Sequence, residues 1–321
     1  MSDLIIRVLR EYDIQQPDGV IAWEAGQSFS GSDHWKVQCG NTSYCLKRWP
    51  AAKPAMRTKR LIELVTPEIQ RHGLPIATPL ECRRGGRFVF EQDRWWDLTP
   101  WQVGAPIKNQ PISRTRLENA MQWLASYHGL AGAQRIENGR SQALNYRYQL
   151  CQTLVDGLLS RLSQWDYDGL APGLPELFVT YAQKSLPELA SLLEQRVGFE
   201  LTLLPVLADV WSDHVFFHGD EVSGVIDFGA MKMDSPCLDL ARLLGSYAGF
   251  DATVIAEGIK YYCAVRDLDE KQIALVELFD RAHVVLAGVQ WLIWLGPEQR
   301  IFKQMPQVNQ HLQNLARRID Q

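Results

Sequence analysis

The sequence lacks the cysteine patterns of a zinc site or of a disulfide framework. None of its six cysteines forms a C-x-x-C pair, and no histidine lies at zinc-finger spacing from them. A chain of 321 residues buries about 75% of its unfolded surface on folding, so its core suffices for stability. We therefore expect free thiols in a reducing compartment.

Long hydrophobic runs and a basic amino-terminal segment are also missing. The most apolar stretch, residues 284–295, has 12 residues and contains Gln290, whereas a membrane span needs about 20. The first residues, Met1-Ser2-Asp3-Leu4, show neither the basic start nor the apolar run of a signal peptide. These absences predict a cytoplasmic protein without a membrane segment.

An excess of positive charge is the third absence. The chain has 33 lysines and arginines against 37 acidic residues, a net charge of −4. Proteins that bind nucleic acid neutralise many phosphates with basic side chains, so nucleic acid is not expected as the main partner. The composition, with 46% hydrophobic and 22% charged residues, is that of a folded globular protein, and the length favours two units.

The first hundred residues show mainly the pattern of β-strands. Gly40-Asn41 separates two β-type runs and predicts a hairpin, and a second hairpin is expected around residues 92–94. A helix is predicted between them, over residues 55–72. Three prolines within residues 99–111 mark a boundary between two lobes, which we place at residues 1–100 and 101–321.

The rest of the chain shows mainly helical periodicity, with Ser113 as the expected cap of the first helix. The exception is residues 206–229, where two apolar runs joined by residues 218–221 predict a further hairpin. The expected fold class is therefore α+β, with a small β-rich amino-terminal lobe and a larger, mostly helical carboxyl-terminal lobe. Chemistry is expected in the cleft between the lobes.

Two carboxylates flank that later hairpin. Asp209 precedes it, and Asp227 follows it 18 positions later within I-D-F-G. Because a hairpin returns the chain, both side chains can face one cleft. Phosphoryl transfer uses such a pair, one aspartate to orient the attacking hydroxyl and one to hold Mg²⁺ on the nucleotide phosphates. Lys47 ends a strand that follows a Gly/Ser-rich turn, residues 26–31, and can reach phosphate oxygens.

These features resemble small-molecule kinases of the aminoglycoside phosphotransferase and choline kinase family, which have a protein-kinase-like fold, and in particular the homoserine-kinase-like branch. The resemblance extends over residues 20–245, in the order of the family. Its motifs are G-L-P-I-A-T-P at residues 73–79, L-T-P-W-Q-V-G at 98–104, L-A-S-Y-H at 124–128, I-D-F-G at 226–229 and D-S-P-C-L-D-L-A at 234–241.

The resemblance implies an ATP-dependent phosphotransferase that moves the γ-phosphate to a hydroxyl of a small molecule, with ATP and Mg²⁺ or Mn²⁺ as cofactors. It makes Asp209 the catalytic aspartate and Asp227 a metal ligand. The positions that it assigns to the nucleotide are Gly26, Ser28, Ser30, Gly31, Lys47, Glu63, Thr99 and Trp101. Glu63 is expected to pair with Lys47, and Glu68 also fits that role.

The segment around Asp209 departs from the family pattern, H-G-D-x-x-x-x-N. Leu207 and Ala208 replace the histidine and glycine, and His214 replaces the asparagine that binds Mg²⁺. An imidazole that ligates favours Mn²⁺ over Mg²⁺; alternatively, His214 only hydrogen-bonds the loop. A nucleotide-binding pseudokinase or scaffold with little turnover is therefore the alternative function. A nearby H-G-D at residues 218–220 is interpreted as the turn of the hairpin.

Two further polar residues are interpreted as structural. Asp239 lies in the first turn of a helix whose start is marked by Asp234-Ser235-Pro236, and it is expected to tie down the loop that carries Asp209. His128 lies on the apolar stripe of another helix and is expected to be a core histidine with its hydrogen bonds satisfied.

Overall fold

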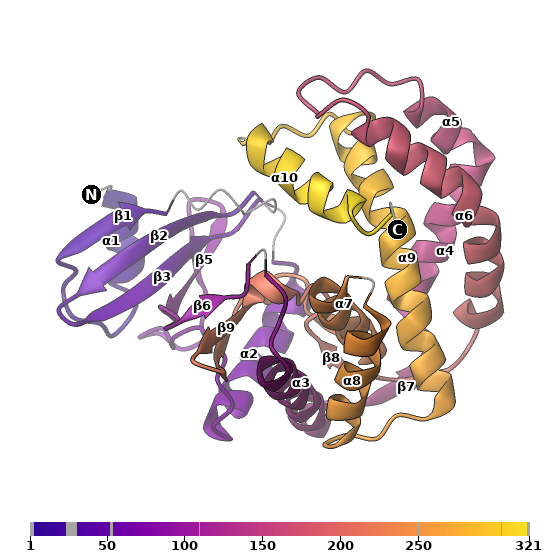
Figure 1. Cartoon of the computed structure of the whole chain (residues 1–321). Coiled ribbons are helices and arrows are strands. Elements are labelled where there is room, and N and C mark those ends of the chain that lie inside the picture. Colours follow the sequence, from indigo (N-terminus) through magenta and orange to yellow (C-terminus); the bar gives the residue numbers. More distant parts are fainter. Residues whose placement is uncertain are drawn as a thin grey trace.

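The computed structural model describes residues 3–23, 31–51, 54–108, 110–249, 251–302 and 304–319. A five-stranded sheet with one short helix occupies one end of the molecule, and helices make up most of the other end (Figure 1). The α+β class predicted from the sequence is confirmed. Within the described ranges, no helix is both long enough and apolar enough to cross a membrane.

The amino-terminal sheet is antiparallel and has the strand order β1-β2-β3-β5-β4. Its strands are β1 (Gly19–Ala22), β2 (Asp33–Cys39), β3 (Thr42–Arg48), β4 (Val89–Glu91) and β5 (Arg94–Pro100). Both predicted hairpins are confirmed. Gln92 and Asp93 join β4 to β5 with positive φ values of 50° and 55°, as a two-residue hairpin turn requires.

Helix α1 (Asp3–Leu9) closes a small hydrophobic core against this sheet. Its apolar side chains Ile5, Val8 and Leu9 are buried together with residues of β2, β3 and β5. This cluster is separate from the main core of the protein. The sheet and α1 therefore form one packed unit.

Helix α2 (Met56–Arg71) follows β3 in sequence but packs mainly with the helical part. Its apolar stripe, which includes Leu61, Val65 and Ile69, joins the main core with residues of α3. The helix is followed by Gly73, whose φ of 78° suits glycine and confirms the predicted stop. Helix α2 thus connects the sheet to the rest of the molecule.

The helical part contains the remaining long elements. They are α3 (Arg114–Gln134), α4 (Gln142–Thr153), α5 (Leu159–Leu162), α6 (Leu174–Val197), α7 (Cys237–Ala248), α8 (Ala252–Cys263), α9 (Glu270–Leu295) and α10 (Met305–Ala316). Ser113 caps α3 as expected, because its hydroxyl accepts a hydrogen bond from the Arg116 N–H. Helix α9 packs against both α6 and α7 and runs through the centre of this part (Figure 1).

Two three-stranded sheets lie within the helical part. One contains β6 (Ala105–Pro106), β9 (Val215–His218) and β10 (Glu221–Val225); the other contains β7 (Glu137–Gly139), β8 (Leu201–Val206) and β11 (Lys232–Asp234). The β9–β10 hairpin confirms the prediction, and the H-G-D of residues 218–220 lies at its turn. Strands β8 and β11 pair, so the segment that precedes Asp209 lies beside the segment that follows Asp227.

Gly288 makes a close contact between two helices in the core and provides a test of this packing. A Cβ atom at Gly288 in α9 would lie 2.1 Å from Phe178 Cδ1 in α6. We expect Gly288→Ala to lower the free energy of unfolding by about 1–3 kcal/mol through overpacking. In Gly129→Ala the new methyl group meets nothing within 4 Å, so that control is expected to gain about 0.5–1 kcal/mol. Urea unfolding of each variant measures its free energy of unfolding. Equal stability of Gly288→Ala and wild type would contradict the close packing of α9 against Phe178 of α6.

Candidate functional site

Lys47 and Asp227 form an ion pair between the amino-terminal sheet and the helical part. Lys47 Nζ donates to Asp227 Oδ1 at 3.0 Å and lies 4.1 Å from the centroid of the Trp49 ring. Gly229 N–H also donates to Asp227 Oδ1, at 3.2 Å. The surrounding protein removes water from the Asp227 carboxyl, which alone raises its pKa; Lys47 and these hydrogen bonds outweigh that effect and hold the pKa below its ordinary value. Asp227 is therefore ionised.

Asp97 is a second carboxylate beside Lys47, and sequence reasoning missed it. The register of β3 and β5 places Asp97 opposite Lys47, and Trp49 Nε1 donates to Asp97 Oδ2 at 2.5 Å. Burial raises the pKa of Asp97 to about 6, although Lys47 and the Trp49 N–H favour the charged form. The sequence feature that could have indicated it is a single acidic residue within the otherwise apolar run W-W-D-L-T of β5.

The ion pair expected between Lys47 and a glutamate of α2 is not found among the described residues. Glu63 instead accepts hydrogen bonds from Lys59 Nζ, at 2.9 and 3.0 Å, and from the Arg87 N–H at 3.1 Å. Glu68 pairs with Arg71 on its own helix. Both glutamates of α2 thus have partners other than Lys47, and Lys47 pairs with Asp227 instead.

The loop of residues 207–214 is held in place by Asp239. Its Oδ2 and Oδ1 accept the N–H groups of Leu207, at 2.7 Å, and Ala208, at 2.6 Å. His128 Nε2 lies 3.2 Å from Asp239 Oδ2, and its Nδ1 lies 2.8 Å from the Tyr262 hydroxyl. The structural roles expected for Asp239 and His128 are therefore confirmed.

Asp209 presents an exposed carboxylate at the surface of this loop. Arg242 Nε lies 3.3 Å from Asp209 Oδ1, and Arg242 Nη1 donates to His283 Nε2 at 3.3 Å. Arg242 was not identified from the sequence. It lies three residues after Asp239 in α7, and residues with this spacing share one helix face, which was the available signal.

His214 closes the loop with both of its ring nitrogens. The Asp209 carbonyl only accepts, so His214 Nδ1 carries the proton and donates to it at 2.9 Å; Trp211 Nε1 only donates, so His214 Nε2 accepts from it at 3.0 Å. No ring nitrogen remains for a metal ion in this arrangement. The structure thus corresponds to the alternative in which His214 hydrogen-bonds the loop.

The main chain of His214 also links the two candidate aspartates. Its carbonyl oxygen accepts the N–H of Ile226 at 3.0 Å, and Ile226 directly precedes Asp227. His214 therefore contacts the Asp209 main chain through its ring and the neighbour of Asp227 through its backbone. The loop and the I-D-F-G segment form one connected structure.

Asp227 has an oxygen that suits a hard divalent cation. Lys47 and Gly229 both contact Oδ1, whereas Oδ2 has no hydrogen-bond partner among the described residues. In that part of the chain there is no group of three or more His, Cys, Asp or Glu side chains that could hold a metal ion. Mg²⁺ is commonly bound by one or two carboxylates together with substrate phosphates. The residues present fit such a shared ion.

The remaining predicted nucleotide positions lie in or next to the strands of the amino-terminal sheet. Thr99 is near the end of β5, and the Trp101 N–H donates to the Ser43 carbonyl at 3.0 Å. The Trp101 ring meets the Trp23 ring edge-on, with centroids 4.9 Å apart. Gly31 has a positive φ of 74° and lies near Pro50. The predicted positions Gly26, Ser28 and Ser30 lie outside the described residues.

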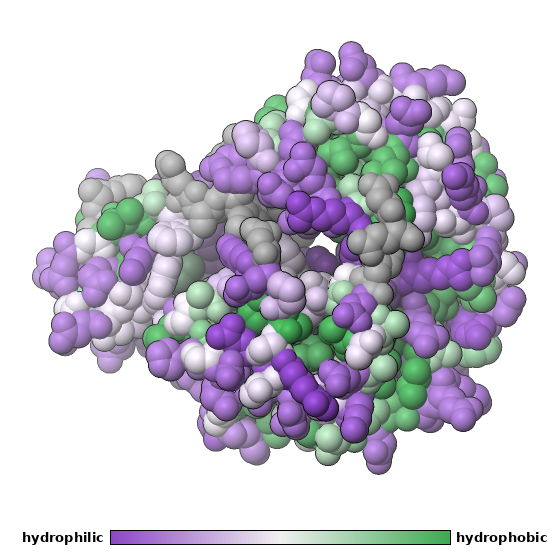
Figure 2. Space-filling view, in the orientation of Figure 1, coloured by the Kyte–Doolittle hydropathy of each residue, from purple (hydrophilic) through white to green (hydrophobic). Residues whose placement is uncertain are grey.

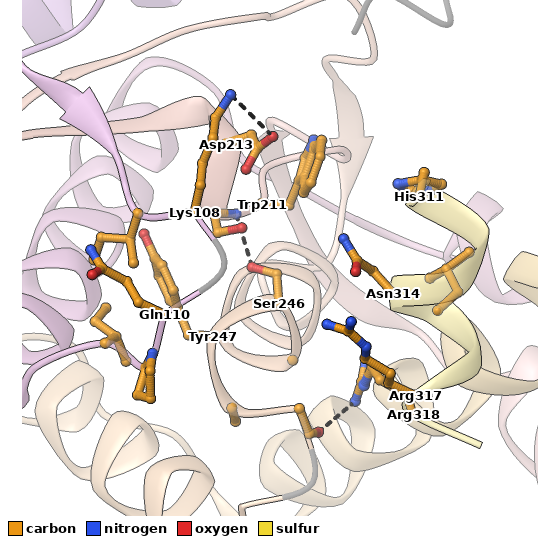
Figure 3. A pocket seen from close by; sticks show the side chains of 18 of the residues that line it. Lys108, Gln110, Trp211, Asp213, Ser246, Tyr247, His311, Asn314, Arg317 and Arg318 are labelled. Carbon is orange, nitrogen blue, oxygen red and sulfur yellow. Dashed lines mark hydrogen bonds and ion pairs between the residues drawn. The ribbon is translucent and has the colours of Figure 1, made fainter. Parts of the chain in front are cut away.

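A cavity of about 750 Å³ lies beside the 207–214 loop. Side chains from residues 107–108 and 110–112, from the loop, from α7 and from α10 surround it (Figure 3). On the face shown in Figure 2 the molecule is hollowed between α7 and α10, with mostly hydrophilic side chains around the hollow. The cavity reaches the candidate catalytic loop through Trp211, Ser212 and Asp213.

Solved structures of other proteins share this fold. A spectinomycin phosphotransferase in complex with ADP and spectinomycin has a TM-score of 0.70 at 12% identity, covering 99% of this chain and 97% of its own. An amicoumacin kinase in complex with AMP-PNP, Ca²⁺ and its antibiotic has a TM-score of 0.65 at 14% identity, covering 98% and 92%. The fold is that of the kinase-like phosphotransferases.

Residues 25–273 match the phosphotransferase enzyme family, and the chain belongs to this family. A homoserine kinase of Parvibaculum lavamentivorans is 28% identical over 221 residues, which cover 66% of this chain and 62% of that protein. A homoserine kinase of Methylobacterium nodulans is 33% identical over 116 residues, which cover 35% of this chain and 34% of that protein. The match thus spans less than two thirds of either relative.

Ala208 offers a test of the loop geometry. Its φ of 65° lies in the left-handed region, which costs a residue with a Cβ about 1–2 kcal/mol relative to the right-handed one. We expect Ala208→Gly to raise the free energy of unfolding by up to about 1 kcal/mol.

The matched control is Ala256→Gly, at an exposed position inside α8. It is expected to lose about 1 kcal/mol, because glycine is a poor helix former. Chemical denaturation of both variants decides the matter. A loss of stability in Ala208→Gly comparable to that of the control contradicts the loop geometry.

Proposed function

We propose that this protein is an ATP-dependent phosphotransferase that transfers the γ-phosphate to a hydroxyl of a small molecule. The observation that carries the proposal is the ionised Asp227, which is held by Lys47 through one oxygen and has its other oxygen free of described partners. The family membership supports it, as do the names of relatives that act on small molecules, homoserine kinase and an aminopropanol kinase.

The nucleotide is proposed to bind to the amino-terminal sheet. Thr99 and Trp101 would hold its adenine, and residues 26–31 and Lys47 would contact its phosphates. Asp227 Oδ2, with the phosphates, holds Mg²⁺ or Mn²⁺, which when bound neutralises charge that develops on the phosphate oxygens. We assign nucleotide binding to residues 1–100 and the loop and acceptor site to residues 101–321, and we place the enzyme in the cytoplasm.

Asp209 is proposed to orient the acceptor. The acceptor oxygen attacks the γ-phosphorus, and a new O–P bond forms as the bond between the γ-phosphorus and the β,γ-bridging oxygen breaks. That oxygen leaves with the electron pair as part of ADP, and the hydroxyl proton passes to Asp209 and then to water. Arg242 holds the carboxylate from one side. Positioning and charge stabilisation account for most of the rate in such reactions.

A screen of ATP consumption across hydroxyl compounds tests the proposal. The panel contains amino alcohols, sugars, hydroxy acids and aminoglycosides, and ADP release is coupled to a spectrophotometric signal. We expect acceptor-dependent turnover, lowered about 10²–10⁴-fold in kcat by Asp209→Asn, because that variant cannot take the proton. The KM for ATP is expected to change little.

Two further variants make the screen specific. Asp227→Ala is expected to abolish metal-dependent ATP binding, which calorimetry measures without an acceptor. Asp166→Asn, at an exposed position outside the site, is the matched control and is expected to behave as wild type. Unchanged turnover in Asp209→Asn contradicts the assigned role.

A nucleotide-binding pseudokinase with little turnover is the second candidate. Two observations favour it: Leu207 and Ala208 replace the histidine and glycine of the family pattern, and Glu63 binds Lys59 instead of Lys47. The lysine–glutamate pair is part of the active arrangement in protein kinases. ATP binding without turnover on any member of the panel supports this candidate over the first.

We propose that His214 positions Asp209 and does not bind the metal ion. We expect His214→Asn to lower kcat and to leave the ratio of Mg²⁺-supported to Mn²⁺-supported turnover within about twofold of wild type, since both ring nitrogens are engaged in hydrogen bonds. Turnover titrations with each ion measure the ratio. A marked shift of the preference from Mn²⁺ toward Mg²⁺ in the variant identifies His214 as a ligand instead.

A further inference from the structure

The cavity beside the 207–214 loop is lined mostly by residues to which the proposed phosphoryl transfer gives no role. The cavity lies between residues 107–108 and 110–112, the loop, α7 and α10, so its side chains come from segments far apart in the sequence (Figure 3). Arg242 belongs both to this lining and to the contacts of Asp209. One wall of the cavity is therefore in direct contact with the proposed catalytic carboxylate.

The charged side chains of the lining are mostly basic. Among the described residues they are Lys108, Arg242, Arg317 and Arg318, against Asp213 and Asp251. Both acids are engaged: Asp213 lies 4.0 Å from Lys108, and Asp251 caps α8 by accepting the N–H groups of Thr253 and Val254. Arg242 and Arg318 in turn contact Asp209 and Asp280, which lie outside the lining. Of the four basic residues, Arg317 is left without an acidic partner among the described residues.

The arginines differ in how firmly the protein holds them. Arg318 is bound by both oxygens of Asp280, at 3.0 and 2.9 Å, and Arg242 is shared between Asp209 and His283. The guanidinium of Arg317 makes no hydrogen bond or ion pair with any described residue; its backbone N–H donates to the Gln313 carbonyl at 3.1 Å. Arg317 is exposed at the end of α10 (Figure 3). Within the described part of the chain, its charge therefore has no counter-charge.

Two buried polar atoms of the lining also lack partners. The Tyr247 hydroxyl and Gln307 Oε1 are inaccessible to solvent and have no hydrogen-bond partner within the described part of the chain. A buried polar group without a partner costs about 1–3 kcal/mol. Native proteins rarely accept that cost twice in one cavity unless a ligand or water satisfies it. The tyrosine offers a donor and the glutamine an acceptor.

Two histidines of the lining have pKa values below the ordinary value of a histidine. Burial, together with Arg242 and Arg318, lowers the pKa of His283 well below its ordinary value. Burial and Arg242 lower the pKa of His311 to about 4. Burial is the largest cause of both shifts, and the field of the neighbouring guanidinium groups adds to it by opposing a further positive charge in this space.

We propose that this cavity binds the acceptor of the phosphotransferase reaction, and that the acceptor is a hydroxy carboxylate, with its hydroxyl toward Asp209 and its carboxylate toward Arg242 and Arg317. The inference rests on the proposed function. Guanidinium groups match the geometry of a carboxylate and bind it through two parallel hydrogen bonds. A polycationic aminoglycoside would place ammonium groups against this field.

The test uses acceptor pairs that differ only in charge. Hydroxy acids, among them 4-hydroxybutyrate and L-homoserine, are compared with their primary amides and with kanamycin in the presence of a saturating non-hydrolysable ATP analogue. Calorimetry measures the dissociation constants in the presence of the analogue. Turnover is measured separately, by coupled ADP release with ATP in place of the analogue. We expect at least one acid to bind tenfold or more tightly than its amide, and kanamycin to bind more weakly than that acid.

A variant pair connects the preference to α10. Arg317→Gln is expected to weaken binding of the preferred acid about tenfold and to leave its amide, the KM for ATP and the melting temperature unchanged. Arg317→Lys keeps the charge and is expected to retain part of the affinity. Arg161→Gln, an exposed arginine of α5 outside the cavity, is the matched control.

The outcomes separate this inference from the function on which it rests. An amide or kanamycin that binds as well as the acids, an unaltered affinity in Arg317→Gln, or failure of every acid to bind overturns the inference. If turnover occurs with such an uncharged or cationic acceptor, the phosphotransferase proposal stands. Tight binding of an acid without ADP release leaves the anion site in place and contradicts the catalytic proposal.

Discussion

The carboxylate of Asp239 is buried in the interior, and its charge is met by N–H groups of the main chain and of His128. Two of those N–H groups belong to the residues immediately before Asp209, so this interaction decides where the loop begins. An uncompensated buried carboxylate is costly, and the loop supplies the compensation. The position of Asp209 is thus coupled to the stability of the core between α3, α7 and α8.

A chain of contacts leads from the loop held by Asp239 to Asp227 and on to Lys47. The His214 ring binds the Asp209 carbonyl, its own carbonyl binds the chain just before Asp227, and Asp227 binds Lys47 of the sheet. The two contacts of His214 are local to the loop and to the β9–β10 hairpin, whereas the contact between Lys47 and Asp227 joins segments that are 180 positions apart. The departures from the family pattern at the loop are therefore accompanied by a complete set of hydrogen bonds, in which the indole of Trp211 takes part.

Local signals in the sequence were enough to predict the hairpins and most helices. Gly40-Asn41, the stop at Gly73 and the cap at Ser113 act over a few residues, and all three are found as expected. Strands β8 and β11 were missed, because a three-residue strand such as β11 forms only through pairing with a distant partner. The partner of Lys47 and the contact of Arg242 with Asp209 likewise depend on tertiary register, which no periodicity encodes.

Helix α2 belongs to the larger part of the molecule, although its place in the sequence is between two strands of the amino-terminal sheet. It leaves the sheet after β3 but shares its apolar stripe with α3 and the main core, whereas the sheet and α1 have a hydrophobic cluster of their own. The Lys47–Asp227 ion pair therefore joins a sheet that has its own hydrophobic cluster to the larger body that contains α2, and Lys47 belongs to the smaller of the two. A charged contact between the two clusters adds to the link that the chain itself makes through α2.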